Sequence, residues 1–210
     1  LEAPAVRIPA SVHQSTPRTM ELIAPTATVV VPPIDFERVR REDRNMAAAE
    51  KGPQRVGVFQ PLPALVQVSG KNTSHGIWTE QSDGTWTWAI RVLAVKALGQ
   101  RIELSQLVLP DGGEVFVYGE SSPKQPFGPF TRIPDRESSL WLPTCFGEST
   151  VLSCRVPREP DTKTVQISVL QTGYLYDNPY ATAIETLSGA CNNDVSCFPG
   201  NWDATLLPLW

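Results

Sequence analysis

The run TWTWAIRV, residues 85–92, constrains the fold more than any other stretch of the chain. Its apolar residues alternate strictly, so Trp86, Trp88, Ile90 and Val92 share one face if the strand is regular. An Asp-Gly dipeptide directly before it is typical of a hairpin turn. The run therefore predicts a half-buried antiparallel strand. Core packing is the simpler role for its tryptophans, and an exposed sugar-binding platform is the alternative.

Further short runs with strand character follow one another from Gly52 onward, separated by turn residues such as Pro110-Asp111-Gly112-Gly113. They are residues 64–69, 76–80, 101–109, 114–119, 139–145, 150–157 and 164–176. The chain also has 20 prolines and 14 glycines, and no long helical pattern stands between the runs. This spacing predicts an all-β fold, an antiparallel β-sandwich of jelly-roll-like type with about eight to ten short strands.

Two other kinds of segment precede the strands. Residues 1–33 are rich in proline and have no glycine, which predicts an extended arm, and a flexible tail is the alternative. Within the arm, TATVVV (26–31) could add a strand to an exposed sheet edge. Asp35 can cap one short helix within residues 34–51, whose charged residues form its solvated face. We assign residues 52–183 to the sandwich and 184–210 to a cysteine-containing C-terminal extension.

Four cysteines are compatible with two disulfides and an oxidising compartment, and buried thiols are the alternative. Cys145 and Cys154 flank a turn in what the pattern predicts to be one hairpin, so we expect them to form a disulfide. Cys191 and Cys197 stand close together near the end of the chain.

Residues for catalysis are scarce. The two histidines are His13, in the arm, and His75, in a polar loop, and neither stands in a serine-protease context. The spacing of Cys191 and Cys197 is not that of a zinc knuckle, and no phosphate-binding glycine loop occurs. We therefore predict no catalytic residue, no metal site and no cofactor. The net charge of -4 argues against a nucleic-acid partner.

The chain begins at Leu1 and has no apolar stretch long enough to span a membrane. Together with the cysteines, this favours an exported protein, periplasmic or extracellular, from which we expect a signal peptide to have been removed.

Several landmarks in the sequence resemble one known family. They occur in the order QRVGV (54–58), GIWTEQSDGTWTWAIRV (76–92), LVLPDGGEVFVYG (107–119), GPFT (128–131), LWLP (140–143) and SGACNNDVSC (188–197). In this order they are similar to the β-rich prodomain of bacterial secreted trypsin-like proteases of the lysyl endopeptidase type. The last of them is similar to the N-terminal segment of the mature protease. The resemblance covers residues from about Ile34 to Trp202.

The resemblance implies the prodomain fold but carries over no catalytic residue. In the family a double barrel follows, with T-A-x-H-C and G-D-S-G-G motifs, and neither motif occurs in this sequence. The family's cysteines that match Cys191 and Cys197 bond to the protease body. In this chain we expect these two to pair with each other, and free thiols are the alternative.

Three functions follow from these observations. We expect a non-enzymatic accessory subunit that binds a protein partner in a larger assembly, which could be a membrane-associated complex, because the sequence given ends at Trp210. The second function is the inhibitory and chaperoning prodomain of a trypsin-like zymogen. The third is a carbohydrate-binding module.

The end of the chain carries the residues that we expect to contact a partner. They are large apolar side chains: Phe198, Trp202, Leu206, Leu207, Leu209 and Trp210. Tryptophan is a common anchor at the centre of an interface. The alternative is that this tail folds back on its own sandwich.

Overall fold

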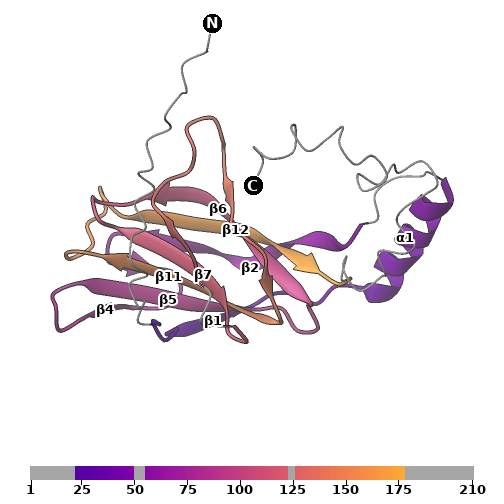
Figure 1. Cartoon of the computed structure of the whole chain (residues 1–210), viewed down its shortest axis with the longest axis horizontal. Helices are drawn as coiled ribbons and strands as arrows, with labels where there is room; N and C mark the ends of the chain where they lie inside the picture. The colour runs from indigo at the N-terminus through magenta and orange to yellow at the C-terminus, as the bar shows by residue number, and fades with distance from the viewer. Residues whose placement is uncertain (1–21, 50–54, 123–125, 178–210) are drawn as a thin grey trace, which may run out of the picture.

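Strands of alternating apolar pattern form two six-stranded sheets that pack face to face (Figure 1). The computed structural model describes residues 22–49, 55–122 and 126–177. Its secondary structure there is twelve strands and one helix, which confirms the all-β sandwich with one short helix.

The first sheet, sheet A, has β5 and β11 at its centre. In spatial order its strands are β1 (Ala27–Val30), β5 (Trp86–Leu93), β11 (Ser149–Val156), β7 (Glu114–Gly119) and β8 (Phe127–Phe130), and β4 (Trp78–Glu80) also pairs with β5. All pairs are antiparallel except β1 with β5, which is parallel. The hairpin of β4 and β5 turns at Asp83-Gly84, as the sequence predicts.

The second sheet, sheet B, has β6 and β12 at its centre. In spatial order its strands are β10 (Cys145–Phe146), β6 (Gly99–Val108), β12 (Gln166–Leu175), β2 (Gly57–Ser69) and β3 (Asn72–Thr73), and β9 (Leu140–Trp141) also pairs with β6. The first half of β2 contains Pro61 and Pro63, and the sequence predicted a strand only over residues 64–69. Proline is tolerated there because β3 pairs only with Val68 and Ser69, which leaves the earlier residues on a sheet edge.

The core lies between the two sheets. Trp88, Ile90 and Val92 of β5 are fully buried and pack in the same cluster as Ile102 of β6 and Ile167 of β12. The prediction that the β5 residues share one buried face is confirmed. Since the Trp88 side chain is buried, it cannot be part of a sugar-binding platform.

Part of the predicted arm belongs to the sandwich. β1 lies beside β5 with Val29 opposite Val92, and Val29 is buried. The strand predicted from TATVVV is therefore present, and the edge on which it pairs belongs to this chain. Just before it, Ile23 packs against Tyr118 on the outer face of sheet A, and its carbonyl accepts a hydrogen bond of 2.9 Å from the Tyr118 hydroxyl.

The predicted helix is α1 (Phe36–Ala49). Asp35 caps it, since its Oδ1 accepts a hydrogen bond of 3.0 Å from the backbone N–H of Arg38. Phe36 packs edge-to-face on Tyr174 of β12, and Val39 is buried. The helix thus contacts the end of β12 through one residue of a narrow apolar stripe.

The predicted hairpin between Cys145 and Cys154 is wrong, and with it the disulfide. Cys145 lies in sheet B opposite Gln100, whereas Cys154 lies in sheet A between Trp88 and Val115. The turn between the two cysteines takes the chain from one sheet to the other instead of reversing it within a sheet. Both residues are buried free thiols.

Among the described residues, no helix is both long and apolar enough to cross a membrane.

Candidate functional site

The partner-contact residues predicted at the end of the chain lie outside the described residues, as do Cys191, Cys197 and His13. Within the described part, Cys145 and Cys154 are core residues and line no cavity. The feature that could bind a partner is a different one. It is an open groove of about 1040 Å³ on the outer face of sheet B, next to the end of the sandwich that carries α1.

The floor of the groove is one row of residues across sheet B. Phe59 of β2 lies opposite Gly173 of β12, which lies opposite Arg101 of β6. Because Gly173 has no side chain, the middle of this row is hollow. A Cβ atom there would lie 3.6 Å from the Arg101 Cβ and 3.7 Å from the Trp141 ring.

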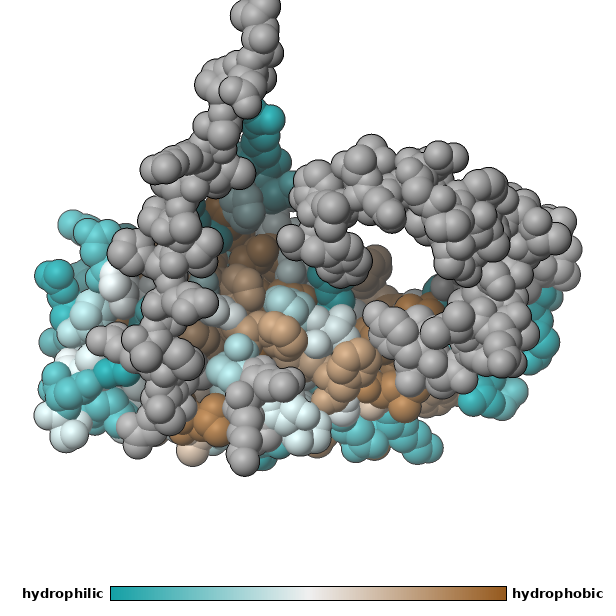
Figure 2. All heavy atoms as spheres, in the orientation of Figure 1, coloured by the Kyte–Doolittle hydropathy of each residue, from teal (hydrophilic) through white to brown (hydrophobic). Residues whose placement is uncertain are grey.

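Aromatic side chains border this hollow. The rings of Phe59 and Trp141 lie 5.0 Å apart, centre to centre, and the guanidinium carbon of Arg101 lies 5.9 Å from the centre of the Trp141 ring. Phe59 is 70% exposed and Phe146, at the other side of the groove, is 54% exposed. Figure 2 shows apolar residues in brown on the side of the molecule where α1 lies. Two such exposed aromatic rings in one groove favour a binding surface.

Two arginines line the groove. Its described lining residues include Arg55 and Arg101 and no acid. The two differ, because Arg55 is paired with Glu42 and Asp43, whereas no carboxylate among the described residues pairs with Arg101. Within the described part of the chain, the Arg101 side chain donates to the backbone carbonyl of Leu142, at 3.1 Å from Nε. Its charge is therefore open to an acidic ligand.

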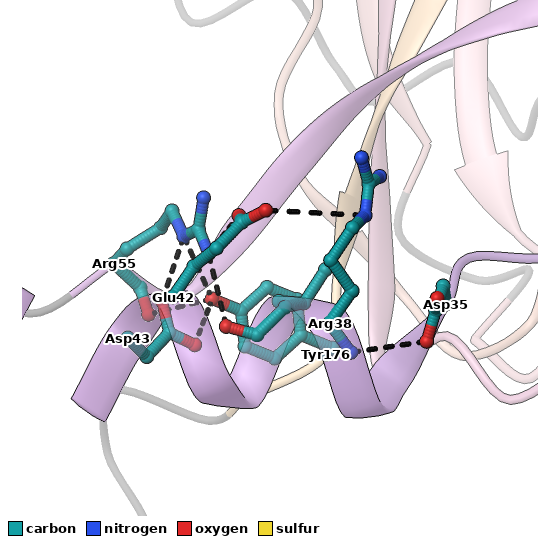
Figure 3. Close-up of polar contacts among 7 residues, drawn as sticks. Asp35, Arg38, Glu42, Asp43, Arg55 and Tyr176 are labelled. Carbon is teal, nitrogen blue, oxygen red and sulfur yellow. Dashed lines mark hydrogen bonds and ion pairs between the residues drawn. The ribbon is translucent and has the colours of Figure 1, made fainter. Parts of the chain in front are cut away.

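A polar cluster fixes the end of the groove to α1 (Figure 3). Arg55 donates from Nε to Asp43 at 2.8 Å and from its terminal nitrogen to Glu42 at 3.1 Å. The Tyr176 hydroxyl donates to Asp43 at 2.7 Å. We call these four residues the α1 clamp.

The clamp changes the protonation equilibria of its members. Burial, and next the hydrogen bond to Asp43, raises the pKa of Tyr176 to about 12. Burial lowers the pKa of the Arg55 guanidinium, but its hydrogen bonds to Tyr176, Glu42 and Asp43 outweigh burial and raise the pKa above its usual value. Both groups thus keep their protons, as the hydrogen bonds require.

The only described histidine lies beside a serine, but the pair is not a catalytic site. Ser74 Oγ lies 3.0 Å from His75 Nδ1. The same hydroxyl donates to the carbonyl of Leu65 and accepts the backbone N–H of Gln67, so it is held as part of a loop. No carboxylate among the described residues orients His75, as a triad would need. The described residues also contain no group of three or more metal-ligating side chains.

One residue in the sequence, Gly173, could have indicated the groove. Gly173 interrupts an apolar strand pattern, and a glycine within a strand often marks a close approach of another group. Phe59 and Arg101 carry no such signal, because their meeting depends on the register of three strands.

Comparison with protein families gives one match. The family described as the lysyl endopeptidase N-terminal domain matches residues 30–176, which begin in β1 and end directly after β12. A search of curated proteins and a search of solved structures each find no match. The family match covers more than half of the chain, and it spans both sheets, α1 and the groove. The chain therefore belongs to the lysyl endopeptidase N-terminal domain family.

Proposed function

We propose that this chain is the prodomain of an exported trypsin-like protease of the lysyl endopeptidase type. In this role it keeps the protease inactive and assists its folding. The observation that carries the proposal is the family match over residues 30–176. The segment SGACNNDVSC, which resembles the start of the mature protease, follows this region in the order expected for a zymogen.

This proposal replaces the accessory subunit that the sequence favoured. That expectation depended on the sequence given ending at Trp210, whereas the family match covers residues 30–176 and does not depend on that end. An exported protease implies a periplasmic or extracellular location for its prodomain.

The first test is the coding sequence downstream of codon 210. An in-frame region that encodes the T-A-x-H-C and G-D-S-G-G motifs supports the prodomain. A stop codon at this point, with no such protease gene nearby, favours the accessory subunit instead.

The biochemical test uses the purified chain and a lysine-specific protease of this family. We expect saturable inhibition of lysyl-amide hydrolysis and a higher yield of active protease after refolding in the presence of the chain. An unrelated β-sandwich protein at equal concentration is the control. If the chain in large molar excess changes neither rate nor yield, the proposed function is wrong.

A further inference from the structure

The two outer faces of the sandwich differ in one respect. On sheet A, the apolar residues Ala89, Tyr118 and Val151 are covered by Ile23 from the N-terminal extension. On sheet B, no described residue covers the groove between Phe59, Trp141 and Phe146. An apolar groove of this size is usually covered by a ligand or by another part of a protein.

The C-terminal segment leaves the described structure at this groove. Leu175 lines the groove, and the backbone N–H groups of Tyr176 and Asp177 donate to the carbonyl of Val56, another lining residue, at 3.1 and 3.2 Å. The next residues in the sequence are Asn178-Pro179, a dipeptide that favours a turn. A reversal here would direct the following residues back over the outer face of sheet B.

The composition of the following residues matches the groove. Residues 178–187, NPYATAIETL, contain the apolar side chains Tyr180, Ile184 and Leu187. Their only charged residue is Glu185, and residues 178–210 contain no lysine or arginine. The groove is lined mainly by apolar residues, and no described carboxylate pairs with the guanidinium of Arg101. Ten residues extend to about 33 Å, which is long enough to reverse and reach Arg101.

We propose that residues 178–187 fold back over sheet B and occupy the groove in the same molecule, with Glu185 paired to Arg101. The inference rests on the proposed function for its biological meaning. These residues join the family domain to the segment that resembles the start of the mature protease, so their docking would hold the junction of prodomain and protease against the sandwich.

A photo-crosslink tests the contact directly in the full chain. Phe59 is replaced by p-benzoylphenylalanine, and the monomeric product is digested with trypsin after irradiation. Because no lysine or arginine lies between Lys163 and Trp210, the segment stays within one peptide, 164–210. Tandem mass spectrometry then identifies the residue attached to the 56–71 peptide. We expect attachment within residues 178–187.

The control is the same replacement at Phe127, an exposed aromatic residue on β8, and it should not attach to residues 178–187.

Charge reversal tests whether Arg101 pairs with Glu185. Arg101→Glu should lower the crosslink yield about fivefold, as loss of a surface ion pair allows. The double variant Arg101→Glu with Glu185→Arg should restore the yield. Because its new arginine is a trypsin site, the crosslink is then sought in the two peptides 164–185 and 186–210. Arg158→Glu, an equal charge change in an exposed loop far from the groove, should leave the yield unchanged. Equal melting temperatures show that each variant is folded.

The outcomes separate this inference from the proposed function. Attachment only to neighbouring strand residues, to a second copy of the chain or to another polypeptide would overturn the groove assignment, as would a double variant without rescue. If the intramolecular crosslink forms but the chain does not inhibit a family protease, the groove assignment stands and the prodomain function is wrong.

Discussion

At the scale of single residues, the surroundings of two glycines show which turn of the chain is packed against a neighbouring loop. Gly70 and Gly84 both have positive φ angles, of 58° and 79°. A Cβ atom on Gly70 would lie 2.5 Å from the backbone nitrogen of Thr162, whereas one on Gly84 meets nothing within 4 Å. The turn after β2 is therefore packed on the loop before β12, and the turn of the β4–β5 hairpin is open.

This contrast predicts that a glycine-to-alanine substitution lowers the stability of the protein by different amounts at the two positions. Gly84→Ala should destabilise the protein by about 1–2 kcal/mol, the cost of a left-handed backbone conformation for alanine. Gly70→Ala carries the same cost plus a backbone clash of about 1–3 kcal/mol. Urea unfolding of both variants measures the difference. Equal stabilities would show that Gly70 is not packed as described.

The two buried cysteines should be unreactive in the native protein. Burial raises the pKa of the Cys145 thiol to about 11 and that of Cys154 well above its usual range, so little thiolate exists at pH 8. We expect iodoacetamide to modify neither residue before unfolding and both residues after it. The tryptic peptide 137–155 contains both cysteines and reports the result in one mass. If the unfolded, unreduced protein still resists modification at both, they are in disulfides and are not free thiols.

At the scale of elements, the α1 clamp connects a helix to the ends of two strands. Arg55 lies just before β2 and Tyr176 just after β12, and both bond to Asp43 on the helix. These contacts stand beside the apolar packing of Phe36 and Val39, so they orient the helix as well as stabilise it.

The α1 clamp should make the stability of the protein depend on pH at high pH. The pKa of Tyr176 is about 12 in the folded protein and 10.0 for the unperturbed side chain. Its folded pKa is raised, so its contribution to stability is complete below pH 10 and is lost as the pH rises toward 12. Tyr176→Phe should therefore be less stable than the wild type by about 1 kcal/mol at pH 8, and the gap should narrow by pH 11.

Urea unfolding at the two pH values measures this gap. Tyr118, whose pKa is also raised to about 12 by burial and by Glu120, titrates in the same window and is present in both proteins. Its effect cancels in the comparison. A gap that stays constant from pH 8 to pH 11 would mean that the Tyr176 phenol is not buried in the clamp.

At the scale of the whole molecule, the N-terminal extension is part of the sandwich. β1 completes the edge of sheet A, and Val29 and Val31 join the central core. The carbonyl of Pro32, directly after β1, also accepts a hydrogen bond of 3.2 Å from Gln60 of sheet B. The extension thus connects the two sheets at one side.

Neighbouring valines on β1 allow a matched test of this role. Val29 is 2% exposed and Val30 is 52% exposed. Val29→Asp places a charge in the core and should cost at least about 3 kcal/mol. Val30→Asp changes the same strand on its solvent face and should cost only about 0.5–1 kcal/mol. Thermal unfolding compares the two variants. Similar small losses for both would mean that β1 is not required for a stable sandwich.

Local patterns in the sequence were sufficient to predict most of the longer elements, although not the first half of β2 or the short strands β3 and β8. Alternation predicted the buried face of β5, Asp83-Gly84 predicted its hairpin with β4, and Asp35 predicted the start of α1. Each of these features depends on side chains within a few residues of one another, because strand alternation and helix capping are short-range effects. The same local order of motifs was enough to indicate the family.

Tertiary structure alone decided which strands became neighbours. The residues around Cys145 and Cys154 read as a hairpin, yet they joined opposite sheets, since each found a better partner far away in the chain. The groove likewise depends on pairing between strands that lie far apart in the sequence. Phe59, Gly173 and Arg101 meet only because β2, β12 and β6 pair in one register, and a shift of one strand by one residue would turn its own member of the row to the core. Alternation specifies which side chains share a face of a strand, but the packing of the whole sandwich determines which faces meet.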